Sequence, residues 1–438
     1  MIAARLNRIR ERVEVARLGS REGRVVRVSG LVVEAIGVPS PVGTLCEICT
    51  THGVLPAEVV GFSDGQTRLM LLANTAGIAP DDRVRLRAGT IRVPVGVGVL
   101  GRVFDGFGRP IDGLGPVLGP RRETIGKAPC PLGRGRIDER LTTGVRAIDA
   151  FVPVGRGQRV GIFAGSGVGK STLLGQIVRH SEADATVIAL VGERGREVRE
   201  FLEETLGEEG RARSALIVAT SDAPPLMRLR AASTAVTMAE AFRDEHKDVL
   251  LVVDSLTRFA AAQREIGLAA GEPPTTRGYP PSVYTELPKL LERLGCSERG
   301  SITALLTVLV EGDDLNEPVA DCVRAILDGH IVLSRALAER NHYPAIDVLA
   351  SVSRVIGRIA SAEGREISAA ARQLLAAYEA GRDLIEVGAY RPGSSPPLDR
   401  AVLLQPRLVE FLRQGAGEFS DIEQTLRELD AILAGGEA

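Results

Sequence analysis

The sequence predicts an α/β fold in which a parallel sheet, covered by helices on both faces, lies between a small β-barrel and a group of C-terminal helices. Three observations predict this fold. Short β-rich runs separated by turns come first, apolar β-branched runs that alternate with helical patterns follow, and helical periodicity ends the chain. Of the 438 residues 44% are hydrophobic and 25% charged, a composition typical of globular proteins.

Charge and cysteine usage exclude several classes of function. The 54 basic and 56 acidic residues leave a net charge of −2, which argues against a nucleic-acid-binding protein. Five cysteines, an odd number, favour a reducing cytosol. No apolar run approaches the roughly 18 residues of a membrane helix, and the N-terminus lacks a signal-peptide segment, so we expect a cytoplasmic protein.

The N-terminal segment has the periodicity of a short amphipathic helix. Ile2, Leu6, Ile9 and Val13 are spaced four, three and four residues apart, which predicts a helix within residues 1–20. Its other face carries arginines and glutamates. This face is either simply solvated or docks onto a partner or an anionic lipid surface. We assign residues 1–20 as a docking helix.

Residues 21–95 are predicted to form the β-barrel domain. Their β-rich runs, which are broken by Gly, Pro and an Asp-Asp pair, are Val25–Val33, Thr44–Thr50, Ala57–Phe62 and Thr67–Leu72. This spacing is typical of a small closed barrel. Cys46 and Cys49 resemble half of a zinc site. Residues three apart on a strand point to opposite faces, however, so we disfavour zinc there.

Residues 96–365 are predicted to form the α/β core. A Gly- and Pro-rich connection at 96–136 leads into it. The strand candidates are Gln158–Phe163, Thr186–Val191, Ala215–Thr220, Val249–Val253, Ile302–Val310 and His330–Leu333. Nearly continuous apolar strands separated by helices predict a parallel sheet that is buried on both faces.

Residues 366–438 are predicted to form a C-terminal helical domain. Apolar residues at helical spacing define three faces: Leu374, Leu375 and Tyr378; Ala401, Leu404, Leu408 and Phe411; and Phe419, Ile422, Leu426 and Leu429. Ser420 and Glu423 have the spacing of a capping box, which predicts that the last helix begins at Ser420.

The core contains a phosphate-binding loop. Ala164–Ser171 (AGSGVGKS) follows a predicted strand and opens a predicted helix, although Ala164 occupies the first glycine position of the usual pattern. Backbone N–H groups of such a loop surround phosphate oxygens, and the helix N-terminus adds a partial positive charge. The predicted nucleotide-binding residues are Gly165, Ser166, Gly167, Val168, Gly169, Lys170, Ser171 and Thr172. Lys170 is expected to contact the β- and γ-phosphates of ATP, and the Ser171 hydroxyl to bind Mg²⁺.

Two carboxylates follow other predicted strands and complete this chemistry. Asp254 ends the apolar run 249–253, at the sheet edge where α/β proteins bind ligands, and is expected to help hold Mg²⁺. Glu193 follows the strand 186–191 and is the predicted general base for the attacking water. The alternative for Glu193 is a salt-bridge cluster with Glu197, Arg194, Arg196 and Arg199, and for Glu197 we favour that structural role.

Long motifs of the chain resemble the type III export ATPases, which serve flagellar export and virulence secretion and are related to the β subunit of F-type ATP synthases. Besides the phosphate loop, the similar segments are Gly192–Phe201 (GERGREVREF), Asp254–Gln263 (DSLTRFAAAQ), Gly271–Val283 (GEPPTTRGYPPSV), Leu309–Pro318 (LVEGDDLNEP), Ala325–Arg335 (AILDGHIVLSR) and His342–Arg354 (HYPAIDVLASVSR). The resemblance covers nearly the whole chain and implies a RecA-like P-loop core.

The resemblance also implies a homohexameric ring with ATP and Mg²⁺ at subunit interfaces. Arg354 matches the arginine finger that completes the neighbouring subunit's site, and Tyr343 matches the tyrosine that stacks on adenine. Arg194 matches a position beside the γ-phosphate. The loop 272–281 matches a segment that faces the central opening of the ring.

The implied function is ATP hydrolysis that energises type III export, as a cytoplasmic ring peripheral to the inner membrane. The implied partners are a stator-like regulatory protein at the N-terminus, a central stalk-like protein, export chaperones with their cargo, and the membrane export gate. The segments 163–171 and 383–390 look more like flagellar members, and an injectisome ATPase is the alternative. A rotary synthase subunit and a non-catalytic ring subunit are weaker readings, and Glu193 speaks against the second.

Overall fold

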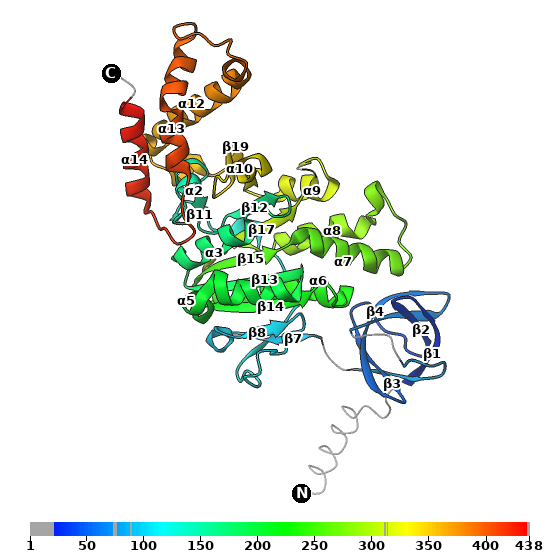
Figure 1. The fold of residues 1–438 in the computed structure, drawn as a ribbon. Helices are drawn as coiled ribbons and strands as arrows, with labels where there is room; N and C mark the ends of the chain where they lie inside the picture. The colour runs from blue at the N-terminus through cyan, green and yellow to red at the C-terminus, as the bar shows by residue number, and fades with distance from the viewer. Residues whose placement is uncertain (1–21, 73–76, 88–89, 311, 313, 436–438) are drawn as a thin grey trace, which may run out of the picture. The chain divides into compact units, whose positions relative to one another are not determined.

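The computed structural model describes residues 22–72, 77–87, 90–310, 312 and 314–435 (Figure 1). They divide into two compact units. The first comprises the described residues up to 91 with the short segments 224–226 and 265–273, and the second comprises the other described residues. The predicted docking helix at 1–20 lies outside the described residues.

The first unit contains the predicted closed barrel, whose strand order is β1-β2-β5-β4-β3-β6. The strands are β1 (Glu22–Ser29), β2 (Val32–Ile36), β3 (Leu45–Thr50), β4 (Gly53–Ser63), β5 (Gln66–Leu71) and β6 (Arg83–Leu86). Val33, Ile48 and Leu69 are fully buried inside it. The single predicted strand Val25–Val33 is wrong, because Gly30 adopts φ 58° and turns the chain between β1 and β2.

The second unit is built on a sheet of order β19-β18-β12-β17-β15-β13-β14-β8, with β16 paired to β17. These strands are β8 (Val103–Asp105), β12 (Arg159–Ala164), β13 (Ala185–Glu193), β14 (Ser214–Thr220), β15 (Asp248–Asp254), β16 (Gly295–Cys296), β17 (Ser301–Leu309), β18 (Gly329–Leu333) and β19 (Ile346–Ser353). Nearly every residue of β13, β15 and β17 is buried, so both faces of the sheet are covered as predicted.

Two features of this sheet differ from the prediction. Strand β19 pairs antiparallel with β18, and the short β16 pairs antiparallel with β17, so the sheet is mixed rather than wholly parallel. The connection at 96–136 supplies the edge strand β8, which runs parallel to β14. It also supplies β9 (Arg121–Glu123), which pairs with β7 (Arg92–Pro94). Edge strands are short or half-exposed, and their apolar patterns are therefore weak in the sequence.

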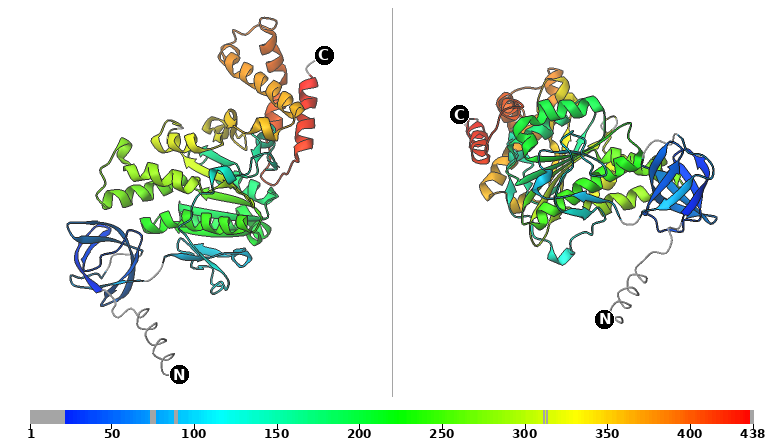
Figure 2. Two further views of the ribbon diagram at one scale, coloured as in Figure 1. Left: turned by 180° about the vertical axis from the view of Figure 1, so that it is seen from behind. Right: turned by 90° about the horizontal axis from the view of Figure 1, so that it is seen from below.

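Helices surround the sheet and follow most of its strands (Figures 1 and 2). They are α2 (Arg146–Phe151), α3 (Lys170–His180), α4 (Gly195–Glu200), the π-helix η3 (Phe201–Leu206), α5 (Gly207–Ala212), α6 (Pro225–Asp244), α7 (Leu256–Ala269), α8 (Pro281–Leu291), α9 (Pro318–Ile326), α10 (Arg335–Glu339) and α11 (Ile356–Ile359). A two-stranded sheet of β10 (Arg140–Leu141) and β11 (Val154–Gly155) flanks α2.

The chain ends in α12 (Ala362–Glu386), α13 (Pro396–Leu412) and α14 (Ile422–Ala434). Leu374, Leu404 and Leu429 are buried, in agreement with the predicted apolar faces. Phe419 was wrongly placed on the last helix: it precedes α14 and is 52% exposed, with its ring against His180.

The N-cap of α14 lies one residue after Ser420, the N-cap that the sequence predicts. The Asp421 carboxylate accepts a 2.8 Å hydrogen bond from the backbone N–H of Gln424, which makes Asp421 the N-cap. The Ser420 hydroxyl instead contacts the Thr425 hydroxyl at 2.8 Å. Asp and Ser are equally good caps, so the sequence pattern did not distinguish the two registers.

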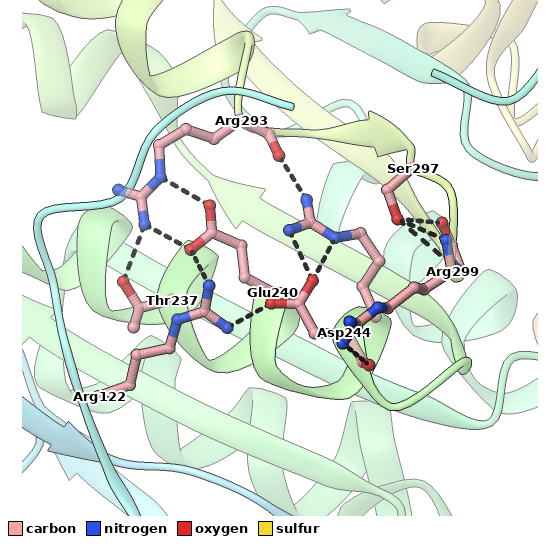
Figure 3. Close-up of polar contacts among 9 residues, drawn as sticks. Arg122, Thr237, Glu240, Asp244, Arg293, Ser297 and Arg299 are labelled. Atoms are coloured by element: carbon pink, nitrogen blue, oxygen red, sulfur yellow. Dashed lines mark hydrogen bonds and ion pairs between the residues drawn. The ribbon is translucent and has the colours of Figure 1, made fainter. Parts of the chain in front are cut away.

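A buried ion pair joins α6 to the chain that follows α8 (Figure 3). The Arg293 guanidinium donates to both Glu240 carboxylate oxygens, at 2.9 and 2.8 Å, and to the Thr237 hydroxyl at 3.0 Å. Its remaining nitrogen donates to the Thr124 carbonyl at 3.1 Å. Only 1% of the Glu240 side chain and 8% of the Arg293 side chain are exposed. The pair therefore fastens the segment after β9 to α6 and to the chain that follows α8.

We expect Glu240→Ala to lower the free energy of unfolding by about 3–5 kcal/mol, because Arg293 would keep a buried charge without its partner. Urea denaturation of the wild-type and variant proteins measures this loss. Glu286→Ala is the matched control, since it removes the exposed pair of Glu286 with Lys289 on α8 and should cost about 0–1 kcal/mol. Equal losses in the two variants would contradict a special role for the buried pair.

Candidate functional site

The phosphate loop occupies the turn between β12 and α3, as the sequence predicts. Gly167 and Gly169 have φ values of 79° and 91°, a backbone conformation that strains residues with a Cβ. Val168 is buried in the hydrophobic core and so anchors the loop, whereas Ser166, Ser171 and Thr172 are exposed. No side chain caps the first turn of α3. Its N–H groups are therefore free to bind an anion.

The structure brings Lys170, Glu193 and Asp254 together at the C-terminal edge of the sheet. The Lys170 ammonium forms an ion pair with Asp254 and lies 3.6 Å from a Glu193 carboxylate oxygen. Asp254 is 2% exposed and accepts a 2.7 Å hydrogen bond from the Thr307 hydroxyl. The sequence does not single out Thr307, because the apolar run 302–310 also contains Thr303 and no pattern distinguishes the two.

A local irregularity of β13 directs Glu193 toward Lys170. The pairing of β13 with β14 shifts register between Val191 and Glu193, and Gly192 between them adopts φ 74°. A Cβ on Gly192 would approach the Arg258 side chain to 3.0 Å. Glycine at 192 therefore permits the turn that places the neighbouring carboxylate in the site.

Burial, and after it the negative charge of Asp254, raise the pKa of the Glu193 carboxyl group to about 7, against the opposing effect of Lys170. A hydrogen bond with Glu193 lowers the pKa of Glu197. In the alternative salt-bridge cluster the arginines pair with other glutamates, and Glu193 contacts the cluster through Glu197. The pairs of the cluster run along the exposed side of α4 and η3 and are Arg194–Glu197 at 3.3 Å, Arg196–Glu200 at 3.4 Å and Arg199–Glu203 at 2.8 Å.

A cleft of about 240 Å³ opens beside these groups. Its lining residues are Ser171, Thr172, Leu190, Glu193, Glu197, Val198, Glu200, Phe201, Glu204, Thr205 and Asp254. The Ser171 hydroxyl and the Asp254 carboxylate are oxygen donors of the kind that Mg²⁺ prefers. Among the described residues no group of three or more His, Cys, Asp or Glu side chains is arranged to hold a metal. A magnesium ion that used Ser171 and Asp254 would therefore depend on phosphate and water for its remaining ligands.

Tyr343 lies against the phosphate loop. A Cβ on Gly169 would be 3.3 Å from Tyr343 Cε1, so the ring edge faces the last glycine of the loop on the side where a Cβ would project. The residue is 41% exposed, which leaves ring surface open to a planar ligand. Its backbone carbonyl accepts a 2.9 Å hydrogen bond from the N–H of Gln414.

Arg354 and Arg194 do not join this group within one chain. Ser353 pairs with Gly329 at the beginning of β18, whereas Ala164 of the phosphate-loop strand pairs with Leu333 at its end. Arg354 therefore lies at the opposite edge of the sheet from Lys170, with its guanidinium on the Arg324 carbonyl at 3.2 Å. The Arg194 side chain is 76% exposed and pairs with Glu197.

The helices of the described segments include none that is both long and apolar enough to cross a membrane. The loop 272–281 contains the short helix η4 (Thr276–Gly278), and Arg277 within it lies 3.3 Å from the Asp314 carboxylate.

Family models match three segments of the chain. Residues 25–86 match the β-barrel domain of the ATP synthase alpha/beta family, and residues 144–353 match the nucleotide-binding domain of that family. Residues 360–431 match the T3SS EscN ATPase C-terminal domain.

Curated relatives match nearly the whole chain. The flagellum-specific ATP synthase of Bacillus subtilis is 50% identical over 97% of this chain and 98% of its own length. The type 3 secretion system ATPase of Xanthomonas euvesicatoria is 48% identical over 95% of each chain.

Two solved structures share the fold. The assembled ATPase EscN of the enteropathogenic E. coli type III secretion system superposes with a TM-score of 0.90 at 42% identity, covering 94% of this chain and 100% of EscN. EscN in complex with its central stalk EscO has a TM-score of 0.86 at 41% identity, with the same coverage.

Proposed function

The chain belongs to the ATP synthase alpha/beta family, among the flagellum-specific and type III secretion ATPases, and we propose that it hydrolyses ATP to energise export of flagellar proteins. The observation that carries the proposed ATP hydrolysis is the convergence of Lys170, Glu193 and Asp254 beside an uncapped helix N-terminus, and similarity to the export ATPases supports the role in export. Such an arrangement binds a triphosphate and activates a water molecule.

Each residue has a distinct role in the proposed reaction. The loop N–H groups and Lys170 bind the phosphates, and Ser171 with Asp254 would hold Mg²⁺, which neutralises charge that develops on the phosphates. Glu193 orients the attacking water and accepts its proton. Because the pKa of Glu193 is about 7, this carboxylate gains a proton more readily than an ordinary glutamate.

The placement of Arg354 supports a ring in which sites are shared. Since its guanidinium lies at the sheet edge away from its own phosphate loop, it is available to a neighbouring copy. Likeness to the assembled ATPase EscN at a TM-score of 0.90 supports an assembly of copies of this chain, which we propose to be a homohexamer. In that ring Arg354 stabilises the charge of the transferring phosphoryl group of the next subunit, and Arg194 lies near the γ-phosphate.

Partners follow from the same comparison. EscN binds a central stalk, EscO, and we propose a stalk-like partner for this chain at the loop 272–281. Residues 1–20 are proposed to dock a stator-like regulatory protein and so to hold the ring at the inner face of the membrane, beside the export gate, where chaperones deliver cargo.

Relatives of the flagellar and virulence branches match at similar identity, 50% and 48% for the two above, so identity does not separate them. The C-terminal match at 360–431 favours an export ATPase over a rotary synthase subunit. We assign the flagellar branch from the motifs at 163–171 and 383–390.

Deletion of the gene from its host should stop secretion of flagellar filament protein, and wild-type protein should restore it whereas Lys170→Ala should not. Lys170→Ala removes the ammonium that binds phosphate, so ATP turnover is lost while the protein is still made. Immunoblots of medium and cells measure secretion and expression. Continued filament secretion together with loss of other type III substrates would place the chain in the injectisome branch.

A further inference from the structure

Gln414 lies in the segment between α13 and α14 and forms four hydrogen bonds. It is 6% exposed. Its side-chain oxygen accepts from the Arg146 N–H at 2.8 Å, and its side-chain nitrogen donates to the carbonyls of Gly144 at 2.7 Å and Glu418 at 3.0 Å. Its own N–H donates to the Tyr343 carbonyl at 2.9 Å. Gln414 therefore joins the backbone of Tyr343 to the start of α2.

The same segment is also fastened to the helix that begins at the phosphate loop. Gln176 of α3 donates to the Glu418 carbonyl at 3.1 Å, and Arg179 of α3 donates to the Ala416 carbonyl at 2.7 Å. Arg146 donates to the Arg413 carbonyl at 2.6 Å. Residues 413–418 are thus held in a defined position relative to α3.

These contacts have a consequence for the ring of Tyr343. The ring edge lies against Gly169, while the backbone of the same residue is bound from behind by Gln414. An aromatic ring stacks well on a base only when the plane and the position of the ring are fixed. If the ring is already fixed before the ligand binds, less conformational entropy is lost on binding and the affinity is higher.

We propose that Gln414 is a positioning residue for the nucleobase: its side chain fixes the segment 413–418, and the backbone N–H of that segment at residue 414 holds Tyr343 against the phosphate loop, so that base and phosphates are bound in one fixed geometry. The inference depends on the proposed function, in which Tyr343 stacks on adenine. Gln414 does not touch the phosphate-binding groups Lys170, Glu193 or Asp254. Its replacement should therefore affect the base and spare the phosphates.

Ligands with and without a base test this directly in the full-length protein. We expect Gln414→Ala to raise the Kd of Mg·ADP by about tenfold, since unpaired buried groups at Arg146 and Gly144 release the segment. The Kd of Mg·tripolyphosphate, which has phosphates but no base, should change by less than about twofold. Isothermal titration calorimetry measures both constants.

A second variant guards against simple misfolding. Gln414→Met keeps the side-chain volume but loses the acceptor for Arg146 and both N–H donors, without placing a negative charge beside the Gly144 and Glu418 carbonyls, and it should show the same selective loss. Equal loss of ADP and tripolyphosphate affinity in the folded variants, or unchanged ADP affinity, would overturn the proposal.

Tyr343→Ala separates this inference from the function on which it rests. If Tyr343→Ala weakens ADP alone and Gln414→Ala adds less than about twofold to it, the two residues act as one unit and the inference holds. If Tyr343→Ala weakens ADP but Gln414→Ala does not, the inference on Gln414 fails by itself. If Tyr343→Ala leaves ADP binding unchanged, the adenine assignment of Tyr343 is wrong and the inference falls with it.

Discussion

Arg354→Ala is expected to lower ATP turnover by about 10³–10⁵-fold, because a finger arginine stabilises charge that appears only in the transition state. ATP binding should be nearly unchanged, since Arg354 lies at the edge of the sheet opposite its own phosphate loop. Steady-state turnover and equilibrium nucleotide binding on purified protein measure the two effects. Arg358→Ala is the matched control, because Arg358 is also exposed, follows four residues later and has no predicted role.

Mixing two inactive variants tests whether the arginine acts between subunits. Arg354→Ala protein retains its phosphate loop, and Lys170→Ala protein retains its finger. In rings assembled from equal amounts of both, about a quarter of the interfaces combine the two intact parts, so turnover should partly return. Mixed rings that stay as inactive as each variant alone would refute a shared site.

Glu193→Gln is expected to reduce turnover by about 10²–10⁴-fold while ATP still binds, because an amide keeps the shape of the side chain but does not accept the water proton. Glu200→Gln is the control, since Glu200 lines the same cleft but pairs with Arg196 on the surface of α4. Near-normal turnover of Glu193→Gln would remove Glu193 from the mechanism.

The pH profile gives the same assignment an independent check. A base must be unprotonated to act, and the pKa of Glu193 in the free protein is about 7. The value of kcat/KM should therefore fall by about tenfold per pH unit below pH 7 and level off above it. The residual activity of Glu193→Gln should lack this dependence. A flat wild-type profile between pH 5.5 and 7, about the range where Glu193 titrates, would contradict the assignment.

The phosphate loop and the acid-ended strands were predictable because their chemistry is local. A glycine-rich turn of this spacing between a strand and a helix is typical of phosphate binding. The continuous apolar run that ends at Asp254 is typical of a strand buried on both faces. The edge strand β19 was not predictable, since its alternating exposure resembles that of many loops. Thr307 and Gln414 were missed because single polar residues carry no pattern.

By itself the sequence determined the α/β class, the closed barrel and the candidate groups for phosphate binding, because periodicity and motif spacing are set by neighbours along the chain. Only the tertiary structure decided which groups meet. It joined Glu193 to Lys170, set Thr307 behind Asp254 and bound Gln414 to Tyr343. It also put Arg354 at the far edge of the sheet, because β19 runs antiparallel to its neighbour. These pairings join residues far apart in sequence, and the packing that selects them exists only once the sheet has formed.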